Sequence, residues 1–83
     1  MKEASGILLV EIVGWYGALA ILAAFGLVSF GMVPADGIFY QLLNFTGAIG
    51  IIVVSAYKHV YQSIALNSIW GVIALVALIR LLI

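Results

Sequence analysis

Three long apolar runs, separated by two short polar breaks, dominate the sequence. The first run covers about residues 7–32, the second residues 38–57 and the third residues 61–83. At ~1.5 Å per residue, a helix of about 20 residues crosses a hydrocarbon core of ~30 Å. The pattern predicts an all-α integral membrane fold, a bundle of three transmembrane helices that forms a single domain over residues 1–83.

The two breaks read as tight connections. In the first, residues 33–37, Pro34 ends the preceding helix and Asp36-Gly37 supplies turn residues. The second is a short hinge at Lys58-His59-Val60. Since neither connection is long enough to cross a membrane, consecutive helices must be antiparallel. We call the end with the N-terminus and the hinge side A, and the end with the Pro34 turn and the C-terminus side B.

Composition supports the membrane assignment and excludes several functions. Hydrophobic residues make up 67% of the chain and charged residues 7%, whereas a soluble domain has about 25% charged residues. The net charge of zero argues against a nucleic-acid partner, which requires a basic patch. Without cysteine, and with the single histidine His59, the chain offers no metal site. We find no catalytic constellation and no phosphate loop, so we expect neither an enzyme nor a cofactor.

The few charges also bear on orientation. Side A carries Lys2 and Lys58, whereas side B carries Arg80. The positive-inside rule therefore favours a cytoplasmic side A, by a margin of about one charge.

A polar break inside the third run is the strongest candidate for a functional site. An amide within hydrocarbon must bond to another helix, to water or to a ligand, and Asn67 is such an amide. Trp70 lies roughly 14 Å into the run, near mid-membrane. Gly71 lets another backbone or a small molecule come close. Asn67, Trp70 and Asn44 in the second run are thus either interhelical hydrogen-bonding residues or the lining of a ligand site.

Glu11 is the one acid inside a run. It is either a proton-coupling site, since intramembrane ionisable residues are often functional, or an interfacial residue that pairs with Lys58 or His59. By depth, Glu11 and Asn67 can meet near side A, whereas Asn44 lies nearer the level of Trp70.

Small residues mark the expected helix contacts, because helices in a membrane associate by close backbone approach. We expect the aromatic residues Trp15 and Tyr16 to line an interior face. The glycines assigned to helix packing are Gly14, Gly17, Gly47, Gly50 and Gly71.

Three motifs together resemble a family of small, uncharacterised bacterial three-span membrane proteins. They are Gly14-Trp15-Tyr16-Gly17, Tyr40-Gln41-Leu42-Leu43-Asn44 and Leu66-Asn67-Ser68-Ile69-Trp70. The resemblance implies a multi-pass protein of the bacterial cytoplasmic membrane.

The chain is more distantly similar to the SemiSWEET half-transporters of the PQ-loop superfamily. That resemblance implies spans packed in the order 1-3-2 and a homodimer around one solute pocket, with Asn67 in the pocket. Ile51 stands near the position of the family's second-span tryptophan, so Trp70 would be its replacement. The Pro-Gln hinge of the family's first span is missing.

Two functions follow as expectations. The first is a SemiSWEET-like homodimeric carrier of a small polar solute, in which Asn67, Trp70 and Asn44 bind the solute and Glu11 couples protons. The second is a non-transporting membrane subunit or scaffold, whose polar residues hold helices together. A solvated cavity at Asn67 favours the carrier, and a dry, tightly packed Asn67 bonded to a backbone carbonyl favours the subunit.

Overall fold

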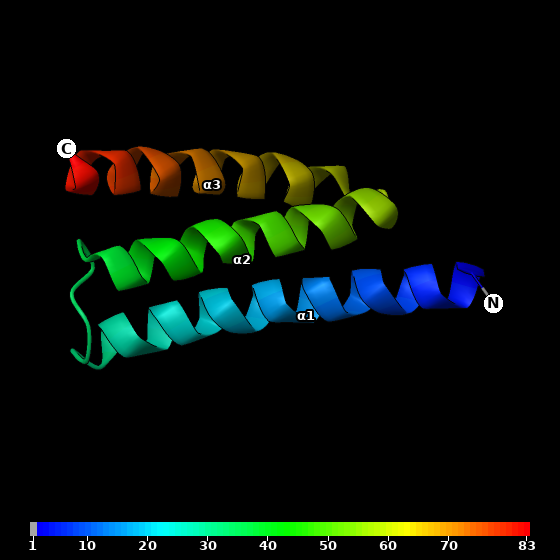
Figure 1. Cartoon of the computed structure of the whole chain (residues 1–83), viewed down its shortest axis with the longest axis horizontal. Coiled ribbons are helices and arrows are strands. Elements are labelled where there is room, and N and C mark those ends of the chain that lie inside the picture. The colour runs from blue at the N-terminus through cyan, green and yellow to red at the C-terminus, as the bar shows by residue number, and fades with distance from the viewer. Residues whose placement is uncertain (1) are drawn as a thin grey trace.

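The protein consists of three antiparallel helices joined by short connections (Figure 1). The computed structural model describes the backbone of residues 2–83 and the side chains of residues 5–83. The helices are α1 (Lys2–Ser29), α2 (Ile38–Tyr57) and α3 (Tyr61–Leu82). All three are long and apolar enough to cross a membrane. The Lys2 side chain, on which the orientation prediction partly depends, lies outside the described side chains.

α1 ends in a Schellman motif centred on Gly31. The Gly31 amide donates to the Val28 carbonyl and the Met32 amide donates to the Leu27 carbonyl, at 3.0 and 2.8 Å. Gly31 has a φ of 72°, the left-handed conformation that this motif requires. The first helix therefore ends before Pro34, within three residues of the predicted boundary at residue 32.

α2 ends in the same motif, but with His59 in the glycine position. The His59 amide donates to the Ala56 carbonyl and the Val60 amide donates to the Ser55 carbonyl. His59 has a φ of 59°, which is unfavourable for a residue with a Cβ atom. The motif reverses the chain within three residues, so α3 begins at Tyr61.

α2 lies between α1 and α3, which make no contact with each other within residues 2–83 (Figure 1). The expected order 1-3-2 is therefore wrong for this chain. The physical reason lies on α2, which has two packing faces. Gly47 and Gly50 face α1, whereas Asn44 and Ala48 face α3.

The α1–α2 interface is a close backbone contact. A Cβ atom on Gly17 would lie 2.5 Å from the Gly47 carbonyl oxygen, and one on Gly50 would lie 2.6 Å from the Val13 carbonyl oxygen. A Cβ on Gly14 would likewise meet the Val54 side chain at 2.7 Å. Glycine is thus what allows these two helices to approach so closely.

The α2–α3 interface is less tight. A Cβ atom on Gly71 would meet the Ala48 side chain at 3.4 Å, near ordinary van der Waals contact. Ala74 and Leu78 continue the buried face of α3 toward side B. Polar bonds, described below, supplement this contact.

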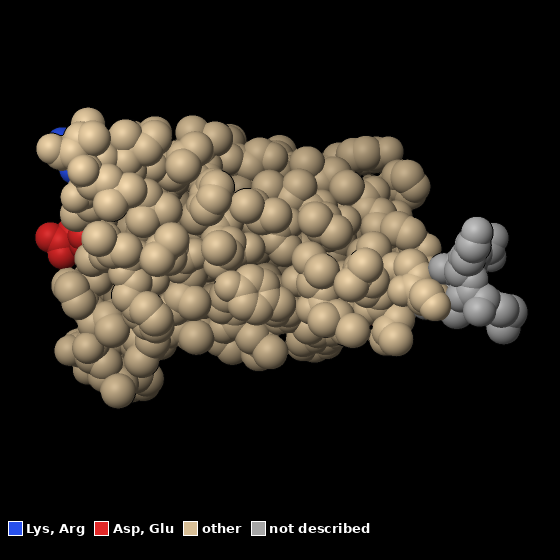
Figure 2. Space-filling model, viewed as in Figure 1, with Lys and Arg blue, Asp and Glu red and all other residues tan. Residues whose placement is uncertain are grey.

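The rest of the surface is apolar, as lipid contact requires. Most large hydrophobic side chains are exposed. On the face shown in Figure 2, the charged atoms of residues 5–83 appear at the end that holds the α1–α2 turn and the C-terminus. α1 has 28 residues against 20 for α2, and its N-terminal turns extend beyond the other helices at side A (Figure 1).

Candidate functional site

Asn44 and Trp70 meet at the α2–α3 interface. The Trp70 indole nitrogen donates a hydrogen bond to Asn44 Oδ1 at 3.1 Å, and Asn44 Nδ2 donates to the Tyr40 carbonyl at 3.0 Å. Asn44 is buried, with 4% of its surface exposed. The prediction that Asn44 lies nearer the level of Trp70 than that of Asn67 is confirmed by this contact.

A cavity of about 200 Å³ opens beside this pair. The residues that line it are Tyr40, Gln41, Asn44, Trp70, Ile73 and Ala74. Gln41 is itself tied to the α1–α2 turn, because its Nε2 donates to the Ala35 carbonyl at 3.3 Å. The cavity therefore lies on the side B half of the α2–α3 interface.

Asn67 does not join this cavity. Its Nδ2 donates to the Ser63 carbonyl at 3.0 Å and lies 3.4 Å from Ser63 Oγ, one turn earlier on the same helix. Ser63 Oγ in turn accepts a 2.7 Å hydrogen bond from Ser55 Oγ of α2. Asn67 thus supports a serine pair that links α2 to α3 near side A.

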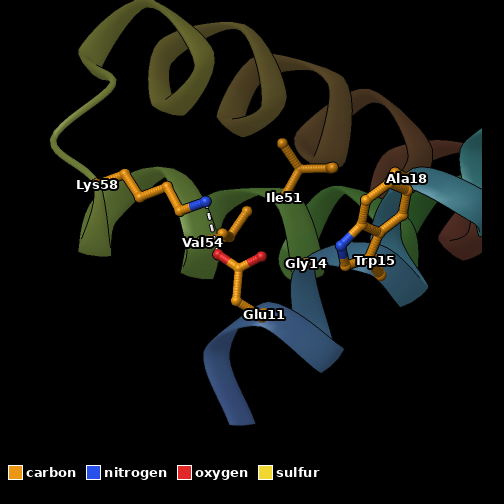
Figure 3. Close-up of a pocket in the computed structure, with 7 residues that line it drawn as sticks. All are labelled: Glu11, Gly14, Trp15, Ala18, Ile51, Val54 and Lys58. Atoms are coloured by element: carbon orange, nitrogen blue, oxygen red, sulfur yellow. Dashed lines mark ion pairs between the residues drawn. The ribbon is translucent and has the colours of Figure 1, made fainter. Parts of the chain in front are cut away.

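Glu11 pairs with Lys58 across the α1–α2 interface, and the Lys58 Nζ to Glu11 Oε1 distance is 2.6 Å (Figure 3). The two side chains are 36% and 53% exposed, respectively. Lys58 directly follows α2, so the pair lies at the side A end of the bundle. Glu11 and Asn67 do not meet, contrary to the depth estimate, because α1 and α3 are held apart by α2.

Two polar links between helices were not predicted from the sequence. Thr46 Oγ1 donates to the Leu42 carbonyl at 2.8 Å, which leaves it to accept a 2.7 Å hydrogen bond from the Tyr16 hydroxyl of α1. The Ser55–Ser63 pair is the second. Both serines lie within a few residues of the hinge, one on each of two antiparallel helices. This spacing could have predicted that their side chains meet.

Trp15 takes a different position from the one expected. Its side chain is 63% exposed rather than turned to an interior face. It lies one residue after Gly14, whose face is closed against α2, and so projects from the outside of the α1–α2 pair (Figure 3).

Comparison with known proteins identifies a family for this chain. No curated protein and no solved structure matches the chain. A family model matches residues 10–83, which include α2, α3 and most of α1. The chain therefore belongs to that uncharacterised family, as a small protein with three helices suited to span a membrane.

Proposed function

We propose that this protein is a non-transporting membrane subunit or scaffold, which acts by assembling with other chains in the bilayer. The observation that carries the proposal is that the candidate site residues bond within the chain. Asn44 and Trp70 bond to each other, Asn67 bonds to a backbone carbonyl, and Glu11 is in an ion pair. The Asn44–Trp70 bond and the Glu11–Lys58 ion pair link neighbouring helices, whereas the Asn67 bond lies within α3.

An apolar groove between α2 and α3 supports the assembly part of the proposal. It has a volume of about 260 Å³, and its small residues Ala48, Ser68 and Gly71 leave room for a neighbouring helix. Ser68 places an exposed hydroxyl there, within hydrocarbon, where a partner helix can supply a hydrogen-bonding group. A second copy of the chain is the simplest partner, which gives a homodimer.

A carrier of a small polar solute is the second candidate, favoured by the cavity beside Asn44 and Trp70. Three helices alone cannot enclose a path, so this function also needs a homo-oligomer. Asn44 and Trp70 would bind the solute, Asn67 would lie nearer side A, and Glu11 would couple protons once its ion pair opens.

Paired measurements on two variants distinguish the candidates. Asn44→Ala and Asn67→Ala would be compared with wild type for thermal unfolding in detergent and for uptake of small polar solutes into proteoliposomes. If the protein is a non-transporting subunit, wild type and both variants should show no uptake above that of protein-free liposomes. Asn44→Ala should also lower the stability of the protein. Wild-type uptake that is abolished in a variant with unchanged stability would favour the carrier and contradict the subunit.

We further propose that the protein resides in a bacterial cytoplasmic membrane with side A in the cytoplasm, on the basis of Lys2 and Lys58. Because the chain has no cysteine, single cysteines can report orientation. Ala35→Cys at side B should react with a membrane-impermeant maleimide added outside intact cells, and Ser5→Cys should not. The reverse labelling would contradict the orientation.

A further inference from the structure

A groove with a charged end runs along the outside of the α1–α2 pair (Figure 3). Its volume is about 230 Å³. Glu11 and Lys58 form the charged end, and the Trp15 ring lies along the groove on the α1 side. The floor is apolar and includes Ala18 and Ile51.

Gly14 sets how closely α1 and α2 approach at this groove. A Cβ atom at this position would lie within 3.0 Å of three Val54 side-chain atoms, so α1 and α2 could not approach as they do. The groove beside this contact is lined by the ion pair at one end and by apolar side chains along its floor. It can therefore hold a ligand with a charged head and a hydrocarbon tail.

The charged end lies at the level of the lipid headgroups. Lys58 is the first residue after α2, and α2, at 20 residues, is about 30 Å long, which matches the hydrocarbon thickness. Glu11 is held at the same level by its contact with Lys58. The apolar floor extends from there toward the membrane interior.

The ion pair occupies only some of the hydrogen-bonding positions of the two charged groups. A carboxylate offers about four acceptor positions and an ammonium three donors, and the ion pair uses one of each. Both side chains are partly exposed. The complementary ligand is a zwitterion, with an anion for Lys58 and an N–H-bearing cation for Glu11.

We propose that this groove binds a phospholipid with a phosphoethanolamine headgroup. The lipid phosphate contacts Lys58, the primary ammonium donates to Glu11 and passes by the Trp15 ring, and an acyl chain follows Ala18 and Ile51. A cation near the face of an indole is attracted to it. The inference does not depend on whether the protein is a subunit or a carrier.

Native mass spectrometry with defined lipids tests the proposal. Wild-type protein in detergent would be given phosphatidylethanolamine, phosphatidylglycerol or phosphatidylcholine with identical acyl chains. Because the ethanolamine ammonium can donate charge-assisted hydrogen bonds to Glu11, we expect this lipid to be retained about tenfold more than either of the other two lipids. Equal retention of all three lipids, or a preference for phosphatidylglycerol or phosphatidylcholine, would overturn the proposal.

Glu11→Gln is the decisive variant, with Asp36→Asn as its control. Both remove one negative charge, but Asp36 lies in the α1–α2 turn at side B. Glu11→Gln should shift the preference toward phosphatidylglycerol, because Lys58 then faces the lipid as an unpaired cation. Asp36→Asn should leave the preference unchanged, and an equal shift in both variants would contradict the site.

Trp15→Leu provides a second test that does not disturb the ion pair. Since Trp15 is mostly exposed, this variant should fold normally. Loss of the indole should lower retention of the ethanolamine lipid about threefold, as expected for a partly exposed cation–π contact. Unchanged retention would show that the ring takes no part and would contradict the proposed pose.

Discussion

The Trp70 indole donates a hydrogen bond to the Asn44 side chain across the α2–α3 interface, with a nitrogen-to-oxygen distance of 3.1 Å. The bond joins a buried amide of α2 to a tryptophan well inside α3. Tryptophan normally lies at the membrane interface, so its place here is explained by the partner rather than by the lipid. This contact is the main polar link between the two helices in the side B half.

Trp70→Phe should destabilise the protein by about 1–2 kcal/mol, because it leaves the buried Asn44 oxygen without its donor. Thermal or denaturant unfolding in detergent measures the change. Trp15→Phe is the matched control. Its ring is 63% exposed, so the same substitution should cost less than about 0.5 kcal/mol there. Equal losses at both positions would argue against a specific Asn44–Trp70 bond.

Gly17→Ala should separate α1 from α2 and destabilise the fold by about 1–3 kcal/mol. Its Cβ would lie 2.5 Å from the Gly47 oxygen and 2.8 Å from the Ile51 nitrogen, both backbone atoms that cannot rotate away. Gly26→Ala, in the same helix, meets no atom within 4 Å and should be neutral or slightly stabilising. If Gly17→Ala left the stability of the protein unchanged, the fold would not depend on the close α1–α2 contact.

His59→Gly should stabilise the protein by about 1 kcal/mol, since it relieves a left-handed conformation at a residue with a Cβ atom. Gly31→Ala is the opposite test, because Gly31 occupies the same position at the end of α1 and should lose about 1 kcal/mol. The changes that the two substitutions cause in the free energy of unfolding should therefore have opposite signs. A destabilising His59→Gly would mean that the imidazole contributes a contact that outweighs the strain.

Ser55→Ala should cost about 1 kcal/mol, because Ser55 is buried and donates the hydrogen bond that links α2 to Ser63 of α3. Asn67→Ala should cost less, since the Asn67 bonds remain within α3. Unfolding of the two variants under one condition gives the comparison. A larger loss for Asn67→Ala would indicate that its amide reaches another helix or a partner.

The sequence predicted the helices well because their lengths are set by the bilayer and their ends by strong local signals. The second span matches α2 at residues 38–57, and the hinge and turn fall at the predicted breaks. The constant rise along a helix also predicts that Asn44 lies nearer the level of Trp70 than that of Asn67, and the two side chains are in contact.

Lateral order and local bonding could not be predicted in the same way. Small residues occur on all three spans, so spacing alone does not reveal that α2 carries two packing faces. The order 1-3-2 rests on the resemblance alone, and it is wrong because α2 packs against both of the other helices. Likewise, an amide four residues after Ser63 can bond backward along its own helix or across to another, and sequence does not choose the rotamer for Asn67.

The oligomeric state in the membrane shows whether the protein acts by assembling with other chains, as we propose. Complexes would be released from native membrane vesicles into a mass spectrometer without detergent exchange. We expect the 8.8 kDa chain to appear in assemblies, either as a homodimer or with another membrane protein. Recovery of single chains alone, under conditions that preserve other membrane complexes, would contradict it.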